Sequence, residues 1–292
     1  MAQFGAKIMS RKEVNSIGSV AELWRYPVKS MLGEAIDDAL VLSEGFLGDR
    51  AYALIDQSSG RVASAKNPVK WEKLLSFKAA YSNSAAKDVP LPPPRITMPN
   101  GSVVFADQEN VDELISDQVG CPVHLTAKRP ESPAVERLDP FSEGETIVDV
   151  GSFMMSGRFS DYAAIHILTT SSLECLRGLY PTGCFDPCRF RPNIVIDSIF
   201  EGETFLENEW VGRVLKIGHE VRLGISDPSP RCAMTTLAQS DLPRDLEILH
   251  TIAKSNSVSV PVLDGKTLPS LGVYGFVEQG GTVCKGDSVL LV

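Results

Sequence analysis

The sequence has no apolar run of about 20 residues, and it has too few basic residues to balance its acidic ones. A membrane-crossing helix needs an apolar run of about that length, so we expect no insertion into a membrane. The 28 Lys and Arg residues against 37 Asp and Glu residues give a net charge of -9. Nucleic acids and anionic membranes bind basic surfaces, so this composition excludes both as general partners. An anionic ligand must therefore meet a local cluster of Arg and Lys.

The sequence also lacks the short motifs that identify several common sites. It contains no GxGxxG after a strand, no GxxxxGK[ST], no HExxH and no CxxC. Its six cysteines are dispersed over 292 residues, too sparsely for a disulfide scaffold, so we expect free thiols in the cytoplasm. The four histidines are scattered. Cys184 and Cys188 alone would supply only half of a tetrahedral metal site.

The composition that remains is that of a folded protein, with 43% hydrophobic and 22% charged residues. Many short strand patterns and few helix patterns favour a β-barrel core with peripheral helices over a doubly wound α/β sheet. Residues 1–17 are expected to be a disordered leader, and Lys128–Glu145 is expected to connect two halves. Helices are predicted over Leu173–Tyr180 and Arg244–Lys254. The predicted apolar face of the second helix consists of Leu246, Leu249, His250 and Ala253.

The most informative stretch is SDPSPRCAMTT, residues Ser226–Thr236. Pro228 and Pro230 stiffen the approach to Cys232. Arg231 directly precedes this cysteine, and a cationic neighbour favours the thiolate form, which acts as a nucleophile or a soft-metal ligand. The alternative is a buried structural cysteine.

A second stretch, RFRPN, spans Arg189–Asn193. In an extended chain Arg189 and Arg191 project from one face, where two guanidinium groups can bind phosphate or carboxylate. The Asn193 amide can both donate and accept a hydrogen bond, which suits the edge of a heterocycle. The alternative is a set of surface ion pairs.

A third group of residues comes from Tyr26–Ser30 (YPVKS) and Gly48–Arg50 (GDR). Lys29 and Ser30 follow a proline, and Arg50 begins the next predicted strand. Each residue is a weak signal alone. Together the three stretches supply one thiol and about five cations, a combination that suits a large anionic cofactor with a soft metal.

In their order along the chain, these stretches resemble the MOSC-domain proteins, named after the C-terminal domain of molybdenum cofactor sulfurases. The resemblance covers about residues 18–292 and rests on YPVKS, GDRAYALID, ASAKNP, FRPNIVI, PRCAMTT and GVYGFVEQGGTVCKGDSV. It implies an α+β, mainly β fold, with a β-rich MOSC N-terminal domain over residues 18–130. A MOSC β-barrel with peripheral helices is expected over residues 140–292, with the cofactor between the two domains.

The relatives of known activity are the mitochondrial amidoxime-reducing component and its bacterial homologues, which reduce N-hydroxylated compounds with molybdenum cofactor. The resemblance implies that Cys232 is the catalytic cysteine whose thiolate ligates molybdenum. Residues expected at the cofactor are Lys29, Ser30, Arg50, Arg191, Asn193 and Arg231. Pyridoxal phosphate binding is a further property associated with the family.

The sequence departs from these relatives where they carry a Thr-Ser pair, because Tyr162 and Ala163 stand there. The missing hydroxyl groups must come from elsewhere, for example Thr169 or Thr170, or the contact is lost. Asp227, five residues before Cys232, is a candidate acid.

Three functions are compatible with this sequence. The first is a molybdenum-dependent reductase of N-hydroxylated small molecules. The second is a carrier of molybdenum cofactor or sulfur without substrate turnover, in which Cys232 could hold a persulfide. The third is a structural domain that has lost its cofactor. The reductase would need a separate electron-donor protein of the flavin reductase or ferredoxin type, because no nucleotide fingerprint or four-cysteine cluster pattern is present.

Overall fold

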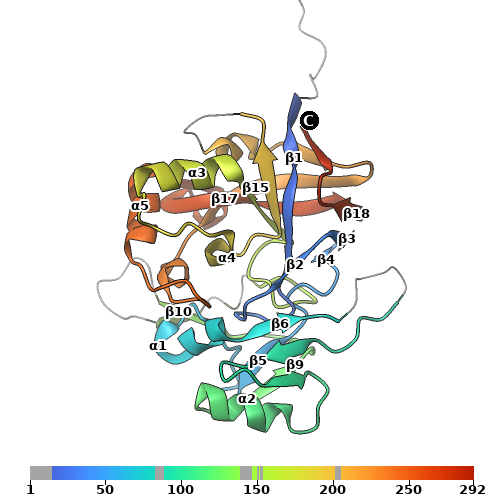
Figure 1. Ribbon diagram of the computed structural model, residues 1–292, viewed down its shortest axis with the longest axis vertical. Coiled ribbons are helices and arrows are strands. Elements are labelled where there is room, and N and C mark those ends of the chain that lie inside the picture. Colours follow the sequence, from blue (N-terminus) through green and yellow to red (C-terminus); the bar gives the residue numbers. More distant parts are fainter. Residues whose placement is uncertain (1–14, 83–88, 139–146, 150, 152–153, 201–204) are drawn as a thin grey trace, which may run out of the picture.

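Seven strands close into a β-barrel (Figure 1). In hydrogen-bonding order they are β12 (Ile165–Thr169), β13 (Ile194–Ser198), β1 (Asn15–Arg25), β19 (Ser288–Leu291), β14 (Val214–Ile217), β15 (Val221–Pro230) and β17 (Lys266–Gln279), which pairs back with β12. The computed structural model describes residues 15–82, 89–138, 147–149, 151, 154–200 and 205–292. The predicted mainly β fold with a barrel is confirmed.

Apolar residues spaced two apart along the strands fill the barrel interior. Leu215 and Ile217 on β14 and Val221, Leu223 and Ile225 on β15 are all buried in one aliphatic core. Successive side chains of a strand point to opposite faces, so this period sends one set inward and the other outward. The outward set faces solvent or the other half of the chain.

The first barrel strand comes from the beginning of the chain. Most of strand β1 falls within residues 18–130, predicted as the N-terminal domain, yet it pairs with β13 and β19 of the barrel. It also pairs with β2 (Glu34–Ile36). The predicted leader over residues 1–17 was too long, because residues 15–17 already belong to β1. Residues 1–14 lie outside the described part.

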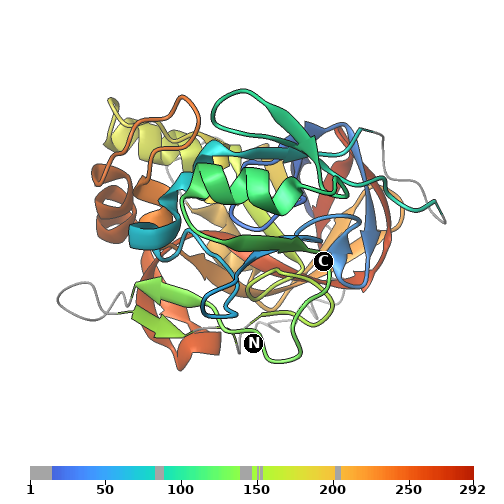
Figure 2. The same ribbon diagram turned by 90° about the horizontal axis from the view of Figure 1, so that it is seen from below.

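The N-terminal half packs below the barrel in the view of Figure 1 and has its own apolar core. Its strands are β3 (Asp38–Leu42), β4 (Gly45–Phe46), β5 (Ala53–Asp56), β6 (Lys78–Ala80), β7 (Arg95–Thr97), β8 (Val103–Phe105) and β9 (Val123–Thr126). Its helices are α1 (Pro68–Trp71), the 3-10 helix η1 (Glu72–Ser76) and α2 (Val111–Val119), which lies at the front of Figure 2. Strand β18 (Gly281–Cys284) pairs with β3 and ties the halves together.

Three helices lie outside the barrel: α3 (Thr170–Leu179), α4 (Pro187–Phe190) and α5 (Glu247–Ser255). Helix α5 begins later than predicted, and the predicted face was wrong: it buries Ile248 and Ile252, whereas Leu246 is exposed. No helix in the described part has the length and hydropathy to cross a membrane.

The remaining elements are short. They are β10 (Glu136–Leu138), β11 (Ile147–Asp149), β16 (Ser257–Val260), and the 3-10 helices η3 (Leu206–Trp210), η4 (Ala233–Thr236) and η5 (Pro261–Leu263). Strand β10 lies within the connection predicted over Lys128–Glu145 and pairs with β11. That segment is therefore not wholly irregular, although residues 139–146 lie outside the described part.

Candidate functional site

A row of polar and aromatic residues occupies the outer wall of the barrel. His166 on β12 and Asp227 on β15 both stand opposite Tyr274 on β17. The neighbouring residues Val273 and Ile225 belong to the barrel core, so this row points outward. The register between β15 and β17 shifts between Ile225 and Asp227, as at a β-bulge, and such a shift re-aims the side chains that follow.

Cys232 lies in the turn that follows this wall. Strand β15 runs through Pro230, and η4 begins at Ala233. The Cys232 carbonyl accepts hydrogen bonds from the backbone N and the Oγ1 of Thr235, at 3.1 and 3.0 Å. These bonds fix the backbone of the turn, and the Cys232 side chain remains partly accessible.

Arg189 contacts the segment that follows Cys232. Its guanidinium group is fully buried and donates to the carbonyl oxygens of Leu237 at 3.1 Å and Pro243 at 2.7 Å. The expectation that Arg189 and Arg191 share one face of an extended chain was wrong. Arg189 lies in α4, and Arg191 is the left-handed residue that ends this helix. Arg189 therefore fixes the segment that follows Cys232, including Thr235, whose carbonyl also accepts from it at 3.3 Å.

Arg50 and Arg191 enclose the ring of Tyr26 between two cations. The carbon of each guanidinium group lies over the ring, at 4.4 Å for Arg50 and 4.3 Å for Arg191. The Tyr26 hydroxyl is buried and has no hydrogen-bond partner among the described residues. Burial, and then the charge of Arg50, lowers the pKa of Arg191 to about 10. Arg50 forms an ion pair with Asp49 at 2.5 Å, whereas Arg191 donates to the carbonyl of Met31, so the two cations keep a net positive charge, as an anion-binding site requires.

Three of the predicted residues have strained backbones. Ser30, Arg50 and Arg191 have φ values of 63°, 49° and 56°, and they make up three of the five non-glycine residues with positive φ in the described part. This left-handed conformation costs a non-glycine residue about 1–2 kcal/mol. Such strain persists where the surroundings enforce it, often at functional sites.

Lys29 and Lys66 share the carboxylate of Asp161. Lys29 Nζ donates to Asp161 Oδ1 and, at 3.0 Å, to the carbonyl of Phe159. Lys66 Nζ lies 2.8 Å from Asp161 Oδ2. Burial alone would raise the pKa of Asp161, but the two lysines outweigh it and hold that pKa well below its usual range. The carboxylate is therefore ionised and joins the two halves of the chain.

Lys66 is a site residue to which the sequence argument assigned no role. Burial lowers its pKa, but attraction to Asp161, Cys232 and Tyr274 outweighs this and raises the pKa above its usual value. Lys66 is therefore a protonated group beside Cys232. Its only sequence signal is its place in ASAKNP. Ser30, also in the site, accepts a hydrogen bond on Oγ from the backbone N of Ala65 at 3.0 Å.

Arg231 lies between the Cys232 turn and β12. It donates to the carbonyl of Phe190 and to Ser229 Oγ, both at 2.8 Å. Its Nε is buried and has no partner among the described residues. Burial, and then the charge of Arg231, lowers the pKa of His166 to about 3. His166 is therefore neutral and adds no further positive charge.

Two predicted residues are engaged within the protein. Asn193 donates through Nδ2 to the carbonyl of Trp24 at 3.2 Å and accepts on Oδ1 from Arg50 at 3.3 Å. It therefore positions Arg50. Asp227 accepts from Tyr162 Oη at 2.8 Å and from the backbone N of Val262 at 2.9 Å. Each carboxylate oxygen is held as an acceptor, which does not suit the expected role as an acid.

The hydroxyl groups expected from Thr169 or Thr170 lie elsewhere. Thr169 caps α3 by accepting from the backbone N of Ser172 and donates to Glu207. Thr170 donates to Asp197. Both threonines therefore belong to the start of α3.

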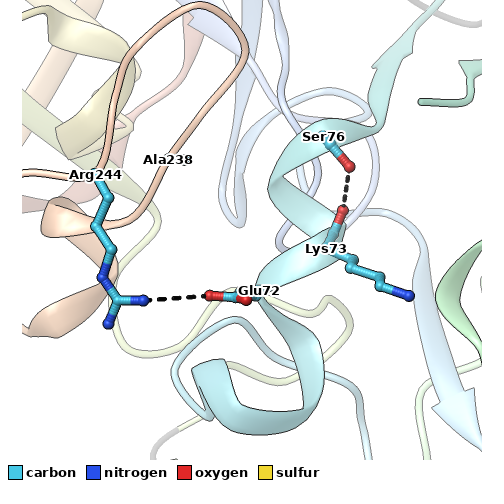
Figure 3. Close-up of a pocket in the computed structure, with 5 residues that line it drawn as sticks. All are labelled: Glu72, Lys73, Ser76, Ala238 and Arg244. Carbon is cyan, nitrogen blue, oxygen red and sulfur yellow. Dashed lines mark hydrogen bonds and ion pairs between the residues drawn. The ribbon is translucent and has the colours of Figure 1, made fainter.

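A surface pocket lies between η1 and the loop that follows η4 (Figure 3). Arg244 reaches across it to Glu72, at 3.8 Å. Its lining residues are Glu72, Lys73, Ser76, Ala238 and Arg244, none of which was predicted as a site residue. The described part also contains no group of three or more His, Cys, Asp and Glu residues placed to hold a metal ion.

The fold and this arrangement define a class of protein: a β-barrel with a cysteine at its outer wall, surrounded by cations from both halves of the chain. Residues 156–290 match the MOSC domain, and residues 17–86 match the MOSC N-terminal beta barrel domain. The chain therefore belongs to the MOSC-domain family, with the N-terminal domain that accompanies it.

Curated relatives match nearly the whole chain. Mitochondrial amidoxime-reducing component 1 of Mus musculus is 27% identical over 98% of this chain and 86% of its own. The Homo sapiens protein of the same name is 27% identical over 97% and 85%. Component 2 of Homo sapiens is 24% identical over 96% and 85%. Among solved structures, the YUAD protein of Bacillus subtilis aligns with a TM-score of 0.46 and 11% identity, covering 95% of this chain and 97% of that one.

Proposed function

We propose that the protein is an oxidoreductase that binds a molybdenum cofactor at Cys232 and reduces N-hydroxylated small molecules. The observation that carries the proposal is the meeting of one accessible thiol with cations from both halves of the chain. The similarity to proteins named amidoxime-reducing components supports the substrate class.

The donor set fits an anionic pterin cofactor. Arg50 is paired with Asp49 and Arg191 with the carbonyl of Met31, so the two guanidinium groups keep a net positive charge. The buried Arg231 Nε and Tyr26 Oη have no partner among the described residues. Guanidinium groups bind phosphate by paired hydrogen bonds. Among the described residues no cluster of His, Cys, Asp and Glu could hold a metal by itself, which suits a metal that a cofactor brings to Cys232.

Each side chain then has a separate task. Arg50 and Arg191 would hold the pterin and its phosphate, and Lys29 would complete the charge around them. Cys232 would supply a thiolate ligand. The chemistry that a bound molybdenum cofactor supplies is two-electron reduction of the N–O bond. Lys66 Nζ is protonated at neutral pH and lies near Cys232, so its charge can stabilise negative charge that develops on the departing oxygen.

Electrons would come from a separate donor protein of the flavin reductase or ferredoxin type. Electron-transfer interfaces are small and transient, so the donor would dock briefly near Cys232. With NADH alone, the purified chain should reduce nothing. With reduced viologen or a donor protein, it should convert an amidoxime to the amidine. Robust NADH-dependent turnover by the chain alone would contradict this electron route.

Cofactor retention tests the binding site directly. Removing a buried charged hydrogen bond costs about 1.5–3 kcal/mol, or roughly ten- to hundredfold in affinity. We expect Arg191→Ala and Lys29→Ala to lower the pterin content of purified protein. Lys70→Ala is the matched control, because Lys70 also pairs with an aspartate, Asp56, at 2.6 Å, and belongs to no predicted site.

The outcome also separates the reductase from the carrier. Wild-type protein that holds pterin and molybdenum but reduces no N-hydroxylated compound would support the carrier. Wild-type pterin content in both site variants would refute the binding site.

A further inference from the structure

Three aromatic side chains form a continuous surface on the outer wall of the barrel. We call Tyr162, Tyr274 and Phe276 the aromatic wall. The ring centroid of Tyr162 lies 5.4 Å from that of Tyr274 and 5.7 Å from that of Phe276, both with edge-to-face geometry. Tyr274 and Phe276 are two residues apart on β17, so they share its outer face.

The aromatic wall borders the Cys232 site. Arg231 directly precedes Cys232, and its Nη1 lies 3.4 Å from His166 Nε2. Tyr274 stands opposite His166 in the barrel, with ring centroids 5.9 Å apart. A ligand held at Cys232 would therefore have the wall at its side.

One end of the wall is fixed and the other is open. Tyr162 donates to Asp227 at 2.8 Å, and Asp227 is held in turn by the backbone N of Val262. Phe276 is 37% exposed, and the residue opposite it on β15 is Gly224, which adds no side chain there. A rigid aromatic surface with one open edge beside polar groups is how ligand sites recognise planar apolar groups.

We propose that the aromatic wall binds the planar aromatic part of the substrate, so that the protein prefers N-hydroxylated compounds that carry an aromatic ring. The N-hydroxyl group rests on the proposed function, whereas the ring preference rests on the wall alone.

Two substitutions at Phe276 test the wall without disturbing the barrel core. Phe276→Ala removes the ring, and Phe276→Leu removes the ring but keeps apolar bulk. Phe105→Ala is the control, because Phe105 is 45% exposed on β8 of the N-terminal half. The probes are a phenyl-substituted and a methyl-substituted amidine, the reduced products, whose affinities for the holoprotein are measured by titration calorimetry.

We expect wild-type protein and the control to bind the phenyl compound more tightly than the methyl compound. Both Phe276 variants should reduce that preference about three- to tenfold, the loss expected for one ring contact. An unchanged preference in both variants, or no preference in the wild type, would contradict the proposal that the aromatic wall binds the ring.

Turnover of the two corresponding amidoximes, measured in parallel, separates the two proposals. Reduction of both amidoximes with the phenyl preference lost in the Phe276 variants would support the wall as a substrate surface. Absence of turnover together with that same loss in binding would contradict the reductase and still support the wall as a ligand surface.

Discussion

The two faces of the barrel wall share the same strands but differ in chemistry. Ile167 and Leu223 point inward and are completely buried among aliphatic side chains. His166 and Asp227, on the same strands, are also buried but point outward among cations and aromatic rings. The difference teaches that alternation along β12 separates a rigid apolar support from a polar site, and that the β-bulge after Ile225 turns Asp227 of β15 to the same polar face.

The aliphatic interior of the barrel stabilises a fold whose site contains destabilising features. Three left-handed non-glycine residues, Ser30, Arg50 and Arg191, cost about 1–2 kcal/mol each, and cations are gathered without full neutralisation. The aliphatic interior offsets these costs through buried apolar area. Substitutions on the two faces should therefore have separable effects, and each prediction below tests that separation.

The largest expected effect is the loss of activity in Cys232→Ala. The side chain is only partly buried, so its removal should leave the melting temperature nearly unchanged while turnover with reduced viologen disappears. Cys284→Ala, at an exposed cysteine on β18, is the control and should retain activity. An active Cys232→Ala protein would contradict the assignment of Cys232 as a metal ligand.

A substitution inside the barrel should lower stability and leave the cofactor site unchanged. Ile167→Ala should lower the free energy of unfolding by about 2–5 kcal/mol, because it leaves a cavity in a closed core. Pterin per folded chain should stay at the wild-type value. Ile199→Ala, at a residue 61% exposed, should change stability little. The separation of the two faces would fail if Ile167→Ala emptied the site while the chain stayed folded.

Acid should destabilise the protein through His166. Its pKa is about 3 in the folded protein, because of burial and Arg231, and about 6.5 when unfolded. Below pH 6.5 His166 is protonated in the unfolded chain but stays neutral in the folded protein. Stability should therefore fall by about 1.4 kcal/mol per pH unit as the pH drops from 6 to 4.5.

Urea unfolding across that range measures this slope. His166→Gln should remove most of it, whereas His219→Gln, at an exposed histidine, should not. Asp161 does not affect this slope. Its depressed pKa gives stability that is present above about pH 4 and is lost below it. Equal slopes in wild type and His166→Gln would contradict the neutral, buried histidine.

The smallest effect concerns backbone strain. Arg191→Gly and Arg191→Ala both remove the side-chain contacts to Tyr26 and Met31, but only glycine adopts a φ of 56° without cost. Arg191→Gly should therefore be more stable than Arg191→Ala by about 1 kcal/mol, as measured by urea unfolding. Equal stability would mean that this backbone is not strained.

Much of the fold could be predicted because strand signals are local. The alternation in β14 and β15 is typical of two paired strands. The helix predicted over Leu173–Tyr180 exists but begins three residues earlier, because Thr169 caps it. The joining of β1 to the barrel could not be predicted, because pairing between distant segments leaves no local pattern. The apolar face of α5 was missed because several of its residues are apolar and only packing selects Ile248 and Ile252.

The site could be predicted in part. The three stretches singled out do meet: Arg50 donates to Asn193, and Arg231 donates to the carbonyl of Phe190. Lys66 was missed because a lone lysine in a turn resembles ordinary surface. Its partner Asp161, which lies far along the chain, identifies it only in three dimensions. The left-handed backbone of Arg191 likewise could not be seen in RFRPN.

The central claim is that the outer wall and the N-terminal half together hold a molybdenum cofactor. Its most direct test is the molybdenum and pterin content of protein made in a host that synthesises the cofactor, and of the same protein after incubation with free cofactor. We expect each near one per chain in the wild type and both strongly reduced in Arg191→Ala. A folded wild-type protein that holds neither, even after incubation with excess cofactor, would contradict the account.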